Sequence, residues 1–434
     1  MSIQTVLPID REAVGAMSAS QQEPAWMTKL RQDAVDLAAG LELPALEKTR
    51  LDRWNLTNYG AFQPTRLLTS FDELPEEARL LVEGQAEGAS IVVQRNSGVV
   101  YHSLSAELAE QGVVFTGLTQ ALSTHSDIIE RHFMQAVKPD ENKLTALHTA
   151  LWNGGVFLYV PAHVRIDKPL QALFVSDDAS ATFAPHVLII AEAGSSVTYV
   201  DNYIGGAGER IVHNGVAEVF AKQGAHVQFA SVHDLAAGVT DLCYRRAVVE
   251  ADARIDWIVG EMNHGESMSD TTSLLKGNGS MSDAKVICVG TNEQKMNITT
   301  RAVHFGRHSN SDMITRAVLR DSSTAIINGI TKIEKGATHA NGEQTERVLM
   351  LSPTARGDAN PMLLIDEDEV TAGHAASVGQ VNPEQVFYMM SRGITREQAT
   401  RLIIYGFLAP VVSEIPISQL EKQLRTVVER KLGQ

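Results

Sequence analysis

A weak internal repeat of about 30 residues runs through the middle of the chain and limits the folds open to it. Apolar residues follow each repeat anchor at +3 and +5, an offset of two that is typical of a strand with one buried face. The anchors recur at spacings of 30, 28, 31 and 39 residues and are Gly194, Gly224, Asp252, Asp283 and Ser322. A turn-and-strand unit of this length predicts a stacked β-solenoid. The alternative is a β-sandwich, whose strands alternate in the same way.

Helical patterns flank this β-rich middle on both sides. Before it, apolar residues at helical spacing run over 26–38, and Gly40 supplies a stop. After it, Gly393 suits a left-handed helix end, and three segments open with capping-box spacings: Asn382 with Gln385, Thr395 with Gln398, and Ser418 with Glu421. We therefore expect a mainly β fold with helical ends: an N-terminal helical region (1–85), a β-helix core (86–365) and a C-terminal helical domain (366–434).

Charge and cysteine content exclude several classes of protein. The 37 Lys and Arg residues face 52 Asp and Glu residues, a formal net charge of −15, and no cationic cluster is present to contact nucleic-acid phosphates. Residues 1–14 lack the pattern of a secretory signal, and the apolar run 402–412 is far shorter than the ~20 residues that span a bilayer. With two cysteines the chain has no disulfide framework. We expect a cytoplasmic protein with no membrane partner and no nucleic-acid partner.

Familiar catalytic signatures are missing from the sequence. It contains no GxxxxGK[ST], no GxSxG and no HExxH, so we expect a protein that is not an enzyme and does not itself hydrolyse ATP. The glycine-rich run 205–208 has the wrong spacing for a dinucleotide fingerprint and predicts a flexible loop. His304 and His308 are separated by Gly306 within β-type sequence, which indicates a strand, a turn and two separate structural histidines.

Candidates for metal chemistry are few. Cys243 and Cys288 lack a CxxC partner, and Cys288 occupies an interior slot of the repeat, which predicts buried packing and no permanently bound cluster held by this chain alone. The acidic run 366–369 predicts a solvated turn. His374 follows it among glycines and alanines, in an expected loop that leaves room for a ligand or partner to approach. An ordinary loop histidine is the alternative.

Two blocks of sequence resemble the SufB/SufD family, the scaffold subunits of the SUF iron–sulfur cluster assembly machinery. The more specific block comprises 361–379, 384–394 and 399–407, and the second comprises 144–150, 155–161 and 168–171. The segments 23–26 and 53–54 are similar to a SufD-type start, so the resemblance covers essentially the whole chain. No Cys follows Cys288, and Ala375 stands where a SufB-type chain usually has Glu, which favours the SufD-type pattern. Ala375 also departs from the Gly that SufD-type chains more often have there.

The resemblance implies a right-handed parallel β-helix between helical ends, acting as a non-catalytic scaffold. It implies pairing with a SufB-type subunit along the β-helix and docking of a SufC-type ABC ATPase on the C-terminal helices. His374 matches the histidine implicated where a transient cluster is built at the shared interface. The expected docking residues are Phe387, Tyr388, Met390, Ser391, Arg392, Gly393 and Phe407. Packing of this apolar stripe within the chain is the alternative, and the isolated chain is a possible homodimer.

Two other functions stay open. One is a SufB-like main scaffold, which the absence of a Cys near His374 disfavours. The other is a β-solenoid enzyme acting on polysaccharide or an acyl group, with Asp252, Asp256 and Glu261 as its carboxylates. The aromatic content of 6% offers few sugar-stacking surfaces to such an enzyme.

Overall fold

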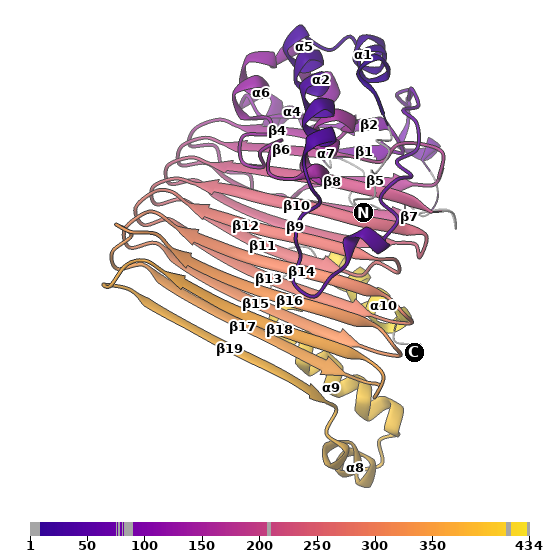
Figure 1. Cartoon of the computed structure of the whole chain (residues 1–434), viewed down its shortest axis with the longest axis vertical. Helices are drawn as coiled ribbons and strands as arrows, with labels where there is room; N and C mark the ends of the chain where they lie inside the picture. Colours follow the sequence, from indigo (N-terminus) through magenta and orange to yellow (C-terminus); the bar gives the residue numbers. More distant parts are fainter. Residues whose placement is uncertain are drawn as a thin grey trace.

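Two long β-sheets lie face to face and form the body of the molecule in this computed structural model (Figure 1). The structure describes residues 9–74, 76, 79, 81, 90–205, 210–413 and 418–431. The first sheet runs in the order β19-β17-β15-β13-β11-β9-β7-β5-β1-β2, and the second in the order β18-β16-β14-β12-β10-β8-β6-β4-β3. From β4 onward successive strands alternate between the two sheets, so the chain winds in coils.

In chain order, the strands of the two sheets have the following bounds. The first sheet contains β1 Ile91–Arg95, β2 Gly98–Ser103, β5 Leu170–Ser176, β7 Ser196–Gly205, β9 His226–Leu235, β11 Arg254–Glu261, β13 Met281–Gly290, β15 Asn310–Leu319, β17 Asn341–Met350 and β19 Thr371–Gln380. The second contains β3 Val114–Gly117, β4 Val156–Val160, β6 His186–Ala191, β8 Ile211–Ala221, β10 Val239–Val249, β12 Ser267–Leu275, β14 Lys295–His304, β16 Thr324–Ile333 and β18 Arg356–Ile365.

Strands two apart in sequence pair in parallel and in register. Asp283 of β13, for example, pairs with Asp256 of β11 on one side and with Asp312 of β15 on the other. Among the described strands only β1–β2 and β3–β4 are antiparallel. The predicted parallel β-solenoid is therefore confirmed, and the sandwich alternative is wrong because a sandwich pairs its strands antiparallel.

Left-handed residues form a column at one edge of the stack. Each of them adopts a positive φ in the turn before a strand of the first sheet: His163, Gly194, Gly224, Asp252, Gly279, His308 and His339. Three repeat anchors, Gly194, Gly224 and Asp252, belong to this column. The other two anchors are corrected by the structure, because Asp283 lies within β13 and Ser322 lies in the turn before β16 of the second sheet.

Most of the N-terminal helices cover the outer face of the second sheet, whereas Leu108 packs against the solenoid interior and Phe71 against outward residues of the first sheet. The helices are α1 Arg11–Ser20, α2 Ala25–Gly40, α4 Ala106–Glu110, α5 Leu118–Thr124, α6 Ser126–His132 and α7 Lys143–Leu151, with 3-10 turns at Leu51–Arg53 and Phe71–Glu73. Apolar residues of the helices on the second sheet form one core with outward side chains of β6, β8, β10 and β12 such as Leu188, Phe220 and Tyr244. Residues 1–8, 75, 77–78, 80 and 82–85 of the expected helical region, and 86–89 of the expected β-helix core, lie outside the described residues.

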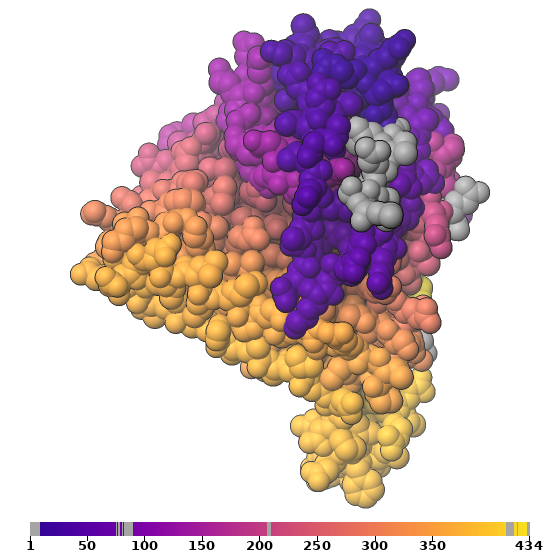
Figure 2. Space-filling model, viewed as in Figure 1, coloured from indigo at the N-terminus to yellow at the C-terminus, as the bar shows by residue number. Residues whose placement is uncertain are grey.

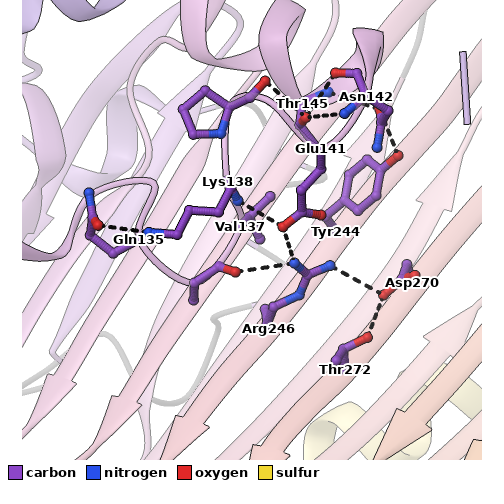
Figure 3. Close-up of polar contacts among 12 residues, drawn as sticks. Gln135, Val137, Lys138, Glu141, Asn142, Thr145, Tyr244, Arg246, Asp270 and Thr272 are labelled. Carbon is purple, nitrogen blue, oxygen red and sulfur yellow. Dashed lines mark hydrogen bonds and ion pairs between the residues drawn. The ribbon is translucent and has the colours of Figure 1, made fainter. Parts of the chain in front are cut away.

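A polar network joins this helical cap to the sheet at β10 (Figure 3). The Arg246 guanidinium pairs with Glu141, donates to the Ala136 carbonyl oxygen at 3.1 Å and lies 4.0 Å from Asp270. Beside it, Tyr244 Oη donates to Asn142 Oδ1 at 3.3 Å, and Asn142 caps α7. The loop before α7 is thus held to the strands by charged hydrogen bonds, which are stronger than neutral ones.

The last two C-terminal helices lie on the opposite outer face, and the first packs on the second beyond the end of the sheets (Figure 1). The C-terminal helices are α8 Pro383–Ser391, α9 Arg396–Val412 and α10 Ser418–Lys431. Ile404 and Leu408 of α9 and Leu424 of α10 pack against outward residues of the first sheet such as Val232 and Ile287. Thr395 and Gln398 form a capping box and Gly393 has φ +87°, both as predicted. Asn382 caps α8 through the Glu384 N–H, with Pro383 at the first turn, but it does not form the predicted capping box with Gln385. The Ser418 side chain lies outside the described residues, so the third capping box stays a prediction.

The domain boundaries differ from the expected ones in two places. β19, at Thr371–Gln380, continues the solenoid beyond residue 365, and helices α4 to α7 lie within the expected β-helix core of 86–365. The difference at the C-terminal side arises because the acidic run 366–369 is a turn between two strands. None of the described helices is both long and apolar enough to cross a membrane.

Candidate functional site

The last coil leaves two strand edges unpaired at one end of the solenoid. Among the described residues β19 and β18 each have one hydrogen-bonded neighbour. The Thr371 N–H donates to the Ala340 carbonyl oxygen at 2.9 Å. Since alternate residues of a parallel strand bond to the same neighbour, the N–H groups of His374, Ala376 and Val378 point away from β17. Such an edge is a template for pairing with another chain.

His374 lies on this edge strand and faces the interior side of the coil. It pairs with Gln344 of β17, and paired residues of parallel strands point to the same face. Gln344 is buried inside the stack, where its Oε1 accepts from the Thr331 hydroxyl at 3.1 Å. His374 is exposed because it belongs to the last coil. The expected loop is corrected to a strand, since the ladder with β17 keeps these small residues extended.

A buried carboxylate lies one coil below His374. Glu346 is 2% exposed and pairs with Ala376, two residues from His374. Its Oε1 occupies the space next to Gly329 that a side chain would fill: a Cβ added to Gly329 would lie 1.8 Å from this oxygen. Its Oε2 has no hydrogen-bond partner among the described residues, and burial raises the pKa of Glu346 to about 7. We call His374, Glu346, Gln344 and Thr331 the open-end cluster.

The α8–α9 pair projects beyond the solenoid (Figure 2), and apolar side chains of both helices are exposed there. Phe387 is 73% exposed and Tyr388 59%, while Val386 turns inward. A groove of about 460 Å³ opens beside Tyr388, between the two helices. Of the other expected docking residues, Met390, Ser391, Arg392 and Gly393 are also exposed. We call Phe387, Tyr388, Met390 and Leu402 the apolar knob.

Phe407 does not belong to the apolar knob. It is half-buried and packs against the core between the C-terminal helices and the first sheet, with its ring centre 5.3 Å from Arg316 Cζ. Packing within the chain therefore explains Phe407. Packing within the chain does not account for the exposed aromatic residues of α8, because an aromatic ring open to solvent adds nothing to the core.

A buried polar cluster inside the solenoid was not expected from the sequence. Asp241 of β10 accepts from His213 Nδ1 at 2.6 Å and from His233 Nδ1 at 2.7 Å. Arg245 donates to His233 Nε2 at 2.7 Å and pairs with Glu261 at 3.1 Å. We call these five residues the interior polar cluster. The one sequence signal for this cluster is the presence of charged residues and histidines at strand positions that face the interior of the solenoid.

The interior polar cluster contains the one group of three possible metal ligands found among the described residues: His213, His233 and Asp241. Arginine has no acceptor, so His233 Nε2 must accept from Arg245, and the proton of His233 lies on Nδ1, facing Asp241. Burial raises the pKa of the Asp241 carboxyl, but the two imidazoles outweigh that effect and hold its pKa well below its usual range. The nitrogens that face Asp241 are occupied by protons, so this arrangement fits a structural hydrogen-bond cluster better than a metal site.

The carboxylates of the enzyme alternative do not form a site. Asp252 lies in a corner turn with φ 55°, Asp256 faces outward to Arg254 and His226, and Glu261 is buried against Arg245. None of the three lines the pocket between α2 and the loop before α7, the pocket under α10 or the groove between α8 and α9.

The remaining candidates are structural. Cys243 and Cys288 are both buried, and burial raises the pKa of the Cys288 thiol to about 12, so the predicted buried packing is confirmed. His304 is buried at the end of β14 and His308 lies in the following turn, as predicted. The acidic run forms a turn as predicted, but it is only partly solvated, because Glu367 is buried and accepts from the Gly336 N–H at 2.8 Å. Residues 206–209 of the glycine-rich segment lie outside the described residues.

Comparison with known proteins gives full-length matches. The family described as SUF system FeS cluster assembly, SufBD core domain, matches residues 174–407, and the SufBD protein N-terminal region matches residues 86–172. The chain is 47% identical to the iron–sulfur cluster assembly protein SufD of Bacillus subtilis, over 100% of both chains. It is 28% identical to the SufB protein of the same organism, over 98% of this chain and 94% of that one. A SufBD family protein of Staphylococcus epidermidis is also 28% identical, over 97% and 93% of the two chains.

Proposed function

The chain belongs to the SufB/SufD family of iron–sulfur cluster assembly proteins, and from this we propose that it acts as the SufD-type scaffold subunit of a SUF complex. In this role it pairs with a SufB-type subunit at the open end of the solenoid. It docks a SufC-type ATPase through α8 and α9 and offers His374 to a nascent cluster at the shared seam. The observation that carries the proposal is a histidine on the interior face of an unpaired last coil.

The open end supports pairing through strand addition. A partner strand laid along β18 or β19 gains main-chain hydrogen bonds from groups that face solvent in the isolated chain. Leu364, Ile365 and Val378 are exposed on the same two strands, so apolar burial adds to those bonds. A second copy of this chain presents the same edges, which is the basis of the possible homodimer.

His374 supports a shared cluster site. A neutral imidazole is a competent iron ligand, and the exposed ring at the open end is accessible to a second chain. Both thiols of this chain are buried, so the remaining ligands come from the SufB-type partner. The cluster is cargo that the complex builds and releases, and we propose no resident cofactor in this chain.

Loss of His374 tests the cluster role. In a complex co-expressed with SufB-type and SufC-type subunits, His374→Ala should reduce cluster formation at least about tenfold, because losing even an outer-shell partner of a metal site costs about 10–100-fold. Cluster formation is followed anaerobically by the visible absorption of iron–sulfur charge transfer. His339→Ala, an exposed turn histidine on the same chain, is the matched control. Equal cluster formation by wild type and His374→Ala contradicts the role.

The apolar knob supports docking of a separate ATPase. The chain lacks a phosphate-binding loop, so any ATP-driven step needs a partner. An exposed aromatic pair beside a groove fits the pattern of an interface centre, where a few aromatic side chains supply most of the binding energy.

Truncation of the knob tests this docking. Phe387→Ala should weaken binding of the SufC-type subunit about 30-fold, equivalent to about 2 kcal/mol for an aromatic hot spot. Leu67→Ala is the control, because Leu67 is also an exposed apolar residue and lies in the N-terminal region. Affinity is measured by titration calorimetry with purified subunits. Unchanged affinity for Phe387→Ala removes α8 from the docking surface.

A further inference from the structure

We propose that the open end of the solenoid holds a ferrous-iron site in which Glu346 is a second ligand beside His374. This inference rests on the proposed function, since it assigns a further residue to the same seam. The ligand class is a divalent transition-metal ion bound by one imidazole nitrogen and one carboxylate oxygen, with its open positions left to the partner subunit. A ligand set that combines imidazole nitrogen and carboxylate oxygen suits Fe²⁺.

The register of the last two coils brings the two side chains to neighbouring positions. Gln344 pairs with His374 and Glu346 pairs with Ala376, so Glu346 is the diagonal neighbour of His374 on the interior face. A strand spacing of about 4.8 Å and a rise of about 3.3 Å per residue put the two Cα atoms about 8 Å apart. Both side chains are long enough to reach one ion between them.

Within the part of the chain that the structure describes, Glu346 lacks a partner that would neutralise the charge of its buried carboxylate. The side chain is 2% exposed, and its Oε2 has no hydrogen-bond partner among the described residues. No described Lys, Arg or His side chain contributes to the shift of its pKa. Uncompensated buried carboxylates are rare because the charged form loses its hydration. A bound cation supplies the missing counter-charge.

The space around the carboxylate is kept free by small residues. Gly329 leaves room for Oε1, and its partner in the last coil is Pro361. On the other sheet the residue above Glu346 is Ala376. In the structure the carboxylate lies against Gly329 across the interior, and an ion held together with His374 requires the Glu346 side chain to turn toward the open end.

The test compares two glutamates of the same strand in the co-expressed complex. Glu346→Gln keeps the shape and removes the charge at the open-end cluster, and Glu343→Gln makes the same change on the outer face of β17. We measure anaerobic binding of Fe²⁺ alone by equilibrium dialysis, and the visible ligand-field bands of Co²⁺ in its place. Glu346→Gln should weaken Fe²⁺ binding about tenfold and alter the Co²⁺ bands, whereas Glu343→Gln should do neither.

The outcomes separate this inference from the proposed function. If His374→Ala abolishes cluster formation but Glu346→Gln binds Fe²⁺ and builds clusters like wild type, Glu346 is no ligand and the scaffold role stands. If neither variant affects cluster formation, the seam site itself is wrong. If Glu346→Gln fails to assemble, Glu346→Asp, which keeps the charge on a shorter stem, replaces it, and an unchanged Co²⁺ spectrum for Glu346→Asp also overturns the inference.

Discussion

Asp241→Ala is expected to lower the free energy of unfolding by about 3–5 kcal/mol, the range for breaking a buried ion pair by removal of one partner. The Asp241 carboxylate accepts from His213 at 2.6 Å, His233 at 2.7 Å and Asn263 at 2.5 Å inside the solenoid. Without it, three buried donors lose their acceptor, and only Glu261 and Asp201 are left near Arg245 to balance its charge. The measurement is urea unfolding followed by circular dichroism at pH 7.5.

Asp256→Ala is the matched control for Asp241→Ala. Asp256 lies on the neighbouring strand β11 but faces outward, and its partners Arg254 and His226 are about half exposed. Exposed ion pairs contribute about 0–1 kcal/mol, so this variant should stay within about 1 kcal/mol of wild type. If Asp241→Ala is equally mild, the interior polar cluster does not hold the coils together.

The stabilisation by Asp241 also has a defined pH dependence. Its pKa is depressed in the folded chain, so its contribution is fully present above the unfolded pKa of about 3.9 and is lost as the pH falls through the folded value. The gap in stability between wild type and Asp241→Asn should therefore be constant above about pH 5 and shrink below about pH 4. A gap that widens on acidification contradicts the assignment.

The sequence predicted the solenoid because its corners and its strands each leave a local signal. Gly194, Gly224 and Asp252 mark one corner column, where the backbone needs a positive φ that glycine and short polar residues tolerate. The column continues through His308 and His339, which no glycine pattern reveals. Ser322 was misplaced because the +3 and +5 apolar offset occurs in both sheets, so the pattern alone does not say which sheet a strand joins. Asp283 was misplaced because Ser282, at +3 from the left-handed Gly279, is polar.

The site was predictable only in part because most of its geometry is non-local. The N-caps of α8 and α9 were predicted, since a cap is closed within four residues, although of these two helices α9 alone forms the full capping box. His374 was found through the family resemblance, but its strand was read as a loop because glycines and alanines carry no strand propensity. Glu346 and the interior polar cluster depend on partners about one coil away in sequence, and a one-residue slip in register would turn them outward.

Ala376→Pro is expected to weaken pairing with the SufB-type subunit at least about 100-fold while leaving this chain folded. The N–H of Ala376 points away from β17, so proline removes no hydrogen bond of the chain itself but takes a donor from the free edge and adds a ring there. Losing two or three interface hydrogen bonds of about 1 kcal/mol each corresponds to this factor. Pro361 already occupies the equivalent slot of β18: the Arg356 N–H donates to the Ser323 carbonyl oxygen, so the N–H of a residue at 361 would also face outward.

Two neighbouring variants make the Ala376→Pro result specific. Ala376→Ser keeps the N–H with little added bulk and should pair like wild type, while Ala375→Pro removes an N–H that points toward β17 and should destabilise the chain itself. Co-expressed subunits are measured by size-exclusion chromatography with light scattering, and each isolated variant by thermal unfolding. A homodimer formed through the same edge should become a monomer with Ala376→Pro. Recovery of the full complex with Ala376→Pro would show that the seam lies elsewhere, because a strand cannot be added along an edge whose central donor is missing and whose face is blocked by a pyrrolidine ring.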